Sequence, residues 1–228
     1  MNQSITARTS FALLWICGVS LRLTVLSVPP VISIIQQDLN LSGTEIGLLS
    51  GMPVVVFAIF AAPGSMLVAR MGVRGALVSG LSIAAGGTLL RTGVANAWEL
   101  YLTTMLMSVG IAFMQPSLAA AVREWTPERS AFSTAVYTNG LIMGEMIPVA
   151  TMLPWVMPHF DGNWRWALGV WAFPLIAAAA IVAMLGPKSA ASVGPKHSAR
   201  WLPQWNSGLN WRIGMTLASI TSTYFCLN

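Results

Sequence analysis

The stretch Ser65-Met-Leu-Val-Ala-Arg-Met-Gly-Val-Arg-Gly75 is a short basic segment between two long apolar runs. Because a charged side chain is costly inside lipid hydrocarbon, Arg70 and Arg74 predict a turn at one face of a membrane. Gly72 permits a tight reversal there, since glycine adopts backbone angles that other residues resist. Lys and Arg in short loops concentrate on the cytoplasmic side, so this turn is predicted to be cytoplasmic and to set the orientation of the other helices.

The composition is that of a membrane protein. The 228 residues are 55% hydrophobic and only 8% charged, whereas soluble domains carry about 25% charged residues. The net charge of +5 is interpreted as a cytoplasmic excess of cations. Nucleic acid is not an expected partner, because its binding needs Lys and Arg clustered on a polar face.

The chain lacks the residue patterns of catalytic and metal sites. It has two histidines and seven acidic residues, without a His/Asp/Glu cluster, a Ser–His set or a glycine-rich phosphate loop. We therefore expect no enzymatic activity, no cofactor and no metal. Cys17 and Cys226 lie in separate apolar segments and are interpreted as small hydrophobic residues.

Six apolar segments are long enough to cross a bilayer, which takes about 20 residues. The predicted spans are 11–31, 46–68, 76–95, 100–122, 132–157 and 166–185. The expected organisation of this all-α, polytopic membrane protein is a cytoplasmic amino terminus at 1–10, a six-helix transmembrane domain at 11–186, a cytoplasmic linker at 187–210 and an incomplete seventh helix at 211–228.

Three local features add detail to the predicted spans. Ser42 or Thr44 is expected to cap the second span, with Glu45 complementing the helix dipole. Arg91 is expected to reach water from the outer end of the third span. The third span also carries small residues suited to close helix packing: Gly80, Ala84, Ala85, Gly86 and Gly87.

The distribution of Lys and Arg supports the orientation. Two cations, Arg91 and Arg165, fall at predicted outer ends. Eight fall at predicted inner ends: Arg8, Arg70, Arg74, Arg123, Arg129, Lys188, Lys196 and Arg200. The protein is therefore expected to be a multi-pass protein of the inner (cytoplasmic) cell membrane with a cytoplasmic amino terminus.

The basic turn resembles the loop between helices 2 and 3 of the major facilitator superfamily, whose pattern is roughly Gly-x-Leu-Ala-Asp-Arg-x-Gly-Arg-Arg. Ser65 and Ala69 replace the first glycine and the acidic residue. Loss of that acid is common in the cyanate-transporter-like (CynX/NimT) branch. The branch is also similar in several short motifs: Leu21-Arg22, Ser27-Val28-Pro29, Met52-Pro53, Ala62-Pro63, Gln115-Pro116 and Trp164-Arg165.

The resemblance implies fold and function. Complete members have twelve helices in two six-helix halves, and this chain resembles the first half, the central linker and the start of helix 7. It implies a secondary transporter of a small solute, cyanate or a similar compound, working by alternating access with possible proton symport. It also implies Arg70, Gly72 and Arg74 as a gating loop, and a missing carboxy-terminal half or a second copy as partner.

Arg22 and Glu145 are charged residues inside predicted spans. Cations at membrane depth usually face a cavity or a partner, so Arg22 is expected to bind an anionic substrate or to form a structural ion pair with Glu145. Glu145 is expected either to carry a coupling proton, because burial favours its neutral form, or only to neutralise Arg22.

Gln115, Tyr137 and Asn139 are polar residues within the fourth and fifth spans. They are candidates for neutral hydrogen bonds to a substrate, and the alternative is that they join helices to one another. Two other function classes stay open beside transport. One is a truncated membrane fragment without activity of its own, and the other is a six-helix channel-like protein.

Overall fold

The computed structural model describes residues 2–187, 208, 211–212, 214–216 and 219. Contacts divide the chain into two units, Met1–Ser192 and Val193–Asn228. In the second unit the few described residues are helical. Most of the predicted linker and seventh helix, together with Lys188, Lys196, Arg200 and Cys226, lie outside the described residues.

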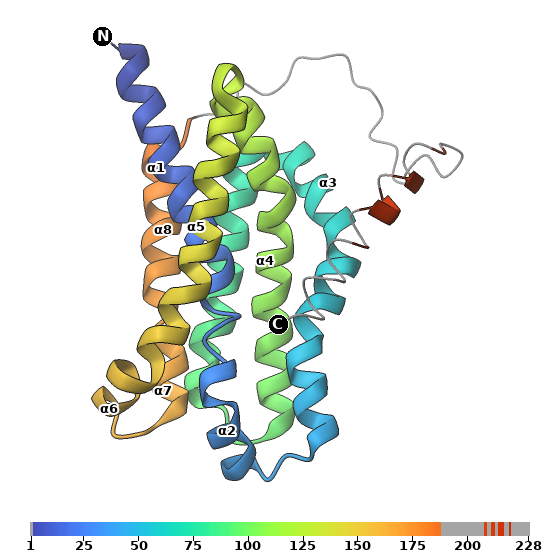
Figure 1. The fold of residues 1–228 in the computed structure, drawn as a ribbon, viewed down its shortest axis with the longest axis vertical. Coiled ribbons are helices and arrows are strands. Elements are labelled where there is room, and N and C mark those ends of the chain that lie inside the picture. The colour runs from blue at the N-terminus through green and yellow to red at the C-terminus, as the bar shows by residue number, and fades with distance from the viewer. Residues whose placement is uncertain (1, 188–207, 209–210, 213, 217–218, 220–228) are drawn as a thin grey trace. The chain divides into compact units, whose positions relative to one another are not determined.

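The described part of the first unit consists of helices joined by short turns and loops, without a strand (Figure 1). The α-helices are α1 (Asn2–Leu23), α2 (Ile32–Leu39), α3 (Gly43–Leu90), α4 (Ala97–Trp125), α5 (Ser130–Thr151), α6 (Met157–His159), α7 (Trp164–Gly169) and α8 (Ala172–Leu185). Short helical turns connect them: η1 (Pro29–Val31), η2 (Arg91–Gly93), η3 (Pro127–Arg129) and the π-helical η4 (Met152–Val156).

The long helix α3 reverses direction at Gly72, as the basic turn predicts. Gly72 has φ 73° and ψ 169°, a conformation that favours glycine. Gly64 lies against Ala112 and Phe113 of α4, and Gly80 lies against Gly110 at nearly the same level of α4. Two residues eight positions before and after Gly72 thus contact neighbouring turns of one helix, which requires the chain to fold back between them.

Four helical stretches among the described residues are long and apolar enough to cross a membrane: Gly43–Gly93, Ala97–Trp125, Pro127–His159 and Trp164–Leu185. Because α3 folds back at Gly72, the first stretch supplies the predicted second and third spans. These stretches therefore account for five of the six predicted spans. The helix α1 is not among them, but it packs along α5 as the sixth rod (Figure 1).

The first predicted span is wrong in its bounds. The sequence predicts one apolar helix over 11–31, whereas α1 begins at Asn2 and ends at Leu23. Pro29 and Pro30 lack the N–H groups that would continue a helix. In addition, the hydroxyl of Ser27 donates a hydrogen bond to the carbonyl of Thr24. Arg22 therefore lies in the last turn of α1 rather than in the middle of a span.

The start of α3 agrees with the predicted cap. The side chain of Ser42 accepts a hydrogen bond from the Glu45 backbone N–H, and Glu45 Oε2 accepts one from the Ser42 backbone N–H at 2.7 Å. This reciprocal pair satisfies two of the N–H groups that a helix start leaves unpaired. Ser42, rather than Thr44, is therefore the cap.

Small residues allow α3 and α4 to pack with their backbones in contact. A β-carbon on Gly80 or Gly87 would collide with the backbone of α4 at Gly110 or Met107. Ala84 lies against Gly110 in the same face, and Ala85 is also buried. Gly86, which the sequence places in this face, instead has open space around its Cα and lines a surface groove of about 600 Å³.

Candidate functional site

Arg22 and Glu145 come together where α1 packs on α5. The Nε atom of Arg22 is 3.5 Å from Oε1 of Glu145, and the two side chains are 28% and 26% exposed. The pair is therefore neither sealed in the core nor free at the surface. Within the described residues, the terminal Nη1 and Nη2 atoms of Arg22 make no hydrogen bond, which leaves the outer edge of the guanidinium group available.

Three glycines permit this pairing. A β-carbon on Gly18 would overlap the carbonyl of Tyr137, and one on Gly140 would overlap the carbonyl of Trp15. Gly144, next to Glu145, lies in the same way against the carbonyl of Val19. The absence of side chains at these positions lets the two backbones approach closely, which brings two charged side chains of moderate length within reach.

Asn139 and Tyr137 lie on α5, within about two helical turns of Glu145. Trp15 Nε1 donates a hydrogen bond of 3.0 Å to Oδ1 of Asn139, so the amide oxygen of Asn139 joins α5 to α1. Tyr137 is half-buried and packs against the apolar core.

Gln115 lies on α4, whereas the other predicted substrate-binding residues lie on α1 and α5. It is exposed on α4, and no hydrogen bond connects it to Arg22, Glu145 or Asn139 in the described part of the chain. The structure therefore groups Arg22, Glu145 and Asn139 along one helix pair and leaves Gln115 on another helix.

The basic turn attaches α3 to α8. Arg74 donates a hydrogen bond from Nη2 to the carbonyl of Ala183, and its methylene groups lie beside Gly186. Arg70 remains exposed. The cation of Arg74 thus sits at the carboxyl end of α8, where the helix dipole favours positive charge.

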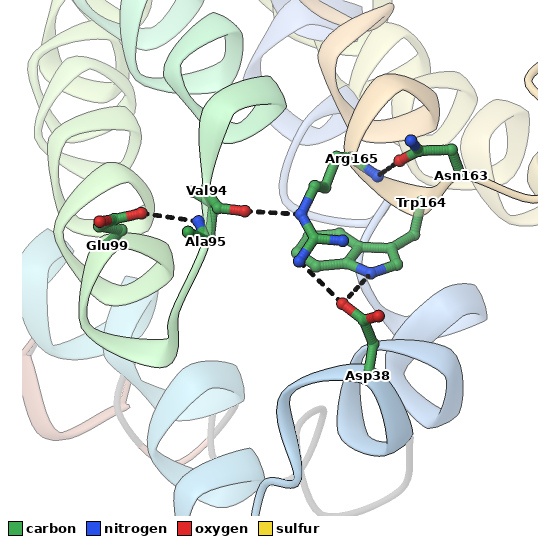
Figure 2. Close-up of polar contacts among 7 residues, drawn as sticks. All are labelled: Asp38, Val94, Ala95, Glu99, Asn163, Trp164 and Arg165. Atoms are coloured by element: carbon green, nitrogen blue, oxygen red, sulfur yellow. Dashed lines mark hydrogen bonds and ion pairs between the residues drawn. The ribbon is translucent and has the colours of Figure 1, made fainter.

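A polar network at the opposite end of the helices was not predicted from the sequence. Arg165 Nη2 is 2.8 Å from Asp38 Oδ2, and Arg165 Nε donates a 2.6 Å hydrogen bond to the carbonyl of Val94. Trp164 Nε1 also donates to Asp38 Oδ2, and its ring lies 4.3 Å from the Arg165 guanidinium carbon. Figure 2 shows these residues, which we call the Asp38–Arg165 network (Asp38, Val94, Trp164 and Arg165).

This network connects three segments far apart in sequence: α2, the loop before α4, and α7. The side chain of Asn163 caps α7 by accepting a hydrogen bond from the Arg165 backbone N–H. Glu99 Oε2 accepts a hydrogen bond of 2.7 Å from the Ala95 backbone N–H (Figure 2). The sequence signal was the pair Trp164-Arg165 beside a predicted loop. No pattern in the sequence, however, identified Asp38 as the partner.

The sequence matches the Major Facilitator Superfamily over residues 14–227. The chain belongs to this superfamily. Its fold is that of a partial, all-α member, and its apolar helices make it a multi-pass membrane protein.

Three curated relatives of this superfamily member have names that describe transporters. "Uncharacterized transporter YycB" of Bacillus subtilis (strain 168) is 31% identical over 159 residues, which are 67% of this chain and 37% of the relative. "Cyanate transport protein CynX" of Escherichia coli (strain K12) is 26% identical over 161 residues, 71% of this chain and 41% of the relative.

The third relative, the "2-nitroimidazole transporter" of Escherichia coli (strain K12), is 22% identical over 209 residues, 91% of this chain and 52% of the relative. The chain therefore spans about half the length, or less, of the curated relatives it matches. The relatives agree with the cyanate-transporter-like branch that the sequence motifs indicate.

The expectation for Arg91 of this superfamily member is wrong. Arg91 was expected to reach water, but its side chain is fully buried at 0% exposure. It turns inward from η2 because Thr104 and the carbonyl of Thr24 accept hydrogen bonds from its guanidinium group. A side chain that snorkels needs a path to the membrane–water interface. The Arg91 side chain points away from the interface and forms hydrogen bonds with Thr24 and Thr104 in place of water.

Proposed function

We propose that this chain forms one six-helix half of a secondary transporter that moves a small solute, most suitably an anion, across a membrane by alternating access. The observation that carries the proposal is the part-exposed Arg22 guanidinium group beside Glu145 at the α1–α5 contact. Support also comes from the relatives, since one is named for cyanate, a small anion, and another for 2-nitroimidazole.

The chemistry of Arg22 suits such a substrate. A guanidinium group is always charged and presents a planar fork of N–H donors, and a small anion can accept two of them in parallel. Arg22 approaches Glu145 through its Nε atom. We propose that the Nη1 and Nη2 edge binds the substrate, offsetting the cost of removing an anion from water.

Neighbouring residues complete the proposed site. Tyr137 and Asn139 would supply neutral hydrogen bonds from α5, and Gln115 would supply them from α4 once the transporter closes around its substrate. Glu145 has two candidate roles: it carries a coupling proton, or it acts only as the counter-ion of Arg22.

The complete transporter requires more than this half-site. Because the chain corresponds to about half of its relatives or less, we propose that a second six-helix half, or a second copy of the chain, completes the substrate site. The turn containing Arg70, Gly72 and Arg74 would act as a gating loop. We further propose that it faces the cytoplasm, as does the amino terminus, in the inner cell membrane.

Substitutions of Arg22 test the proposal in a transporter completed by co-expression with a matching second half. Arg22→Lys keeps the charge but loses the fork, so substrate binding should weaken, and Arg22→Ala should abolish binding. The informative variant is the double change Arg22→Ala with Glu145→Ala, which removes both charges together. We expect it to be expressed without transporting; full transport of cyanate by this variant would refute the anion site.

A further inference from the structure

The helix that carries Arg22, the proposed anion-binding residue, ends directly after it. α1 stops at Leu23, and residues 24–27 form turns before η1 begins at Pro29. The last carbonyl groups of an α-helix have no partner within the helix, so this end needs support from outside. The carbonyl of Arg22 accepts a 3.0 Å hydrogen bond from the Leu26 backbone N–H, which makes the position of Arg22 depend on the turns that follow it.

Arg91 supports these turns from another part of the bundle. It lies in η2, and its side chain is completely buried. Its Nη1 atom donates a 3.4 Å hydrogen bond to the carbonyl of Thr24, and its Nη2 atom donates a 2.9 Å hydrogen bond to the Thr104 hydroxyl of α4. The Nε atom has no partner among the described residues. The guanidinium group therefore joins the end of α1 to α4 through these two hydrogen bonds.

The charge of Arg91 lies at the carboxyl ends of two helices. Arg91 directly follows Leu90, the last residue of α3, and its guanidinium group reaches the carbonyl of Thr24, the first residue after α1. The carboxyl end of a helix carries a partial charge of about −0.5, so the two ends together offset about one positive charge. Such compensation explains how Arg91 is buried without a carboxylate within ion-pair distance among the described residues.

We propose that Arg91 is a positioning residue, which fixes the carboxyl end of α1 and thereby holds Arg22 against Glu145. The Thr24 carbonyl is two positions beyond Arg22, and Arg22 is the last residue but one of α1. Unwinding of one turn there would release Arg22 from its 3.5 Å contact with Glu145. The effect on substrate binding rests on the proposed function, whereas the restraint on the end of α1 does not.

The first test measures backbone hydrogen–deuterium exchange of the purified 228-residue chain in detergent, in the segment 22–28. Arg91→Met keeps much of the apolar volume of the side chain and removes its donors. Exchange in this segment should become about ten-fold faster or more, because a hydrogen bond from a charged donor is lost and the turns open locally. An exchange rate equal to that of the wild type would overturn the proposal.

Arg165→Met is the matched control. The Arg165 guanidinium group also donates to a backbone carbonyl, that of Val94, but it does not contact the end of α1. Exchange in the segment 22–28 should therefore stay close to the wild-type rate in this variant. Equal acceleration in Arg91→Met and Arg165→Met would mean that both variants only destabilise the whole fold, and it would overturn the proposal.

A pair of substitutions at Thr104 tests the same restraint without changing Arg91. Thr104→Val keeps the shape of the side chain and leaves the Nη2 atom of buried Arg91 without an acceptor, which is unfavourable. We expect faster exchange in the segment 22–28 for Thr104→Val and wild-type exchange for Thr104→Ser, which retains the hydroxyl group. Identical exchange in the two variants would contradict the role of Arg91.

Transport measurements test the link to Arg22 in a transporter completed by co-expression with a matching second half. Arg91→Met should raise the half-saturating concentration of cyanate about ten-fold or more, since a misplaced binding group loses affinity steeply. Arg91→Lys retains a donor and should lie between Arg91→Met and the wild type, and Arg165→Met should leave this concentration unchanged. Faster exchange in Arg91→Met without this rise would refute the positioning of Arg22. If the wild type itself does not transport cyanate, the proposed function fails, while the exchange rates still decide whether Arg91 fixes α1.

Discussion

Replacing Arg165 with methionine should destabilise the protein by about 2–3 kcal/mol, because three contacts of the Asp38–Arg165 network depend on its guanidinium group. The ion pair to Asp38 joins side chains that are 25% and 43% exposed, so solvent screening limits it to about 1 kcal/mol or less. The hydrogen bond to the carbonyl of buried Val94 has a charged donor and contributes about 1.5–3 kcal/mol.

The third contact is the stacking of Arg165 on Trp164, which contributes about 0.5–1 kcal/mol at a partly exposed site. These contributions overlap because one side chain makes all three, so the measured loss should fall below their sum. Methionine retains much of the apolar volume and removes only the charged donors. For a chain of this length, the loss corresponds to a decrease in Tm of about 4–12 °C.

Thermal unfolding in detergent, followed by tryptophan fluorescence, measures this effect. Asp38→Asn should cost less, about 1 kcal/mol or less, because its amide oxygen still accepts from Trp164. The matched control is Asp161→Asn: Asp161 is an exposed acidic residue near α7 with φ 51°, a conformation that asparagine tolerates. We expect its Tm to equal that of the wild type.

The double variant, Asp38→Asn with Arg165→Met, completes a thermodynamic cycle. Residues in direct contact should show a coupling energy of about 0.5 kcal/mol or more. If Arg165→Met leaves Tm within the error of the wild type, or if the two substitutions are strictly additive, the network does not hold these three segments together and the reasoning fails.

Three further outcomes are expected. A reporter active only in the cytoplasm should be active when fused after Ser189 and silent at Gly162, and the reverse pattern would overturn the proposed orientation. Gly144→Ala should lower Tm by overpacking against Val19, at a cost of about 1–3 kcal/mol, whereas Gly86→Ala, which meets open space, should not. In a completed transporter, Glu145→Gln should abolish proton-driven accumulation and spare substrate exchange if Glu145 carries the coupling proton; unchanged accumulation would exclude Glu145 from coupling.

The fold was largely predictable because its main signals are local. The apolar runs identify the helices, since a bilayer demands about 20 apolar residues per span, and Gly72 between two arginines identifies the reversal in α3. The ends of the helices were less predictable where polar side chains form hydrogen bonds that compete with the backbone hydrogen bonds of the helix. The break after Leu23 depends on the hydroxyl of Ser27 as well as on Pro29 and Pro30.

The candidate site was predictable only in part. Arg22 and Glu145 were identifiable because a charge within an apolar span is costly and therefore informative. Their contact also depends on Gly140 and Gly144, whose role is visible only once α5 is packed on α1. Gln115 has the same polar character in sequence, yet it lies on another helix away from the pair.

The sequence by itself determined the class of protein, five of the six predicted spans and the turn at Gly72, because composition and backbone preference act over a few residues. Only the tertiary structure determined where the side chains of two arginines lie. Arg91 and Arg165 both follow apolar or turn segments and look equally suited to solvent, but Arg91 is buried between Thr24 and Thr104, and Arg165 reaches Asp38. The partners of these two residues are 67, 13 and 127 positions away in sequence, and only the packing of the helices brings them within hydrogen-bonding distance.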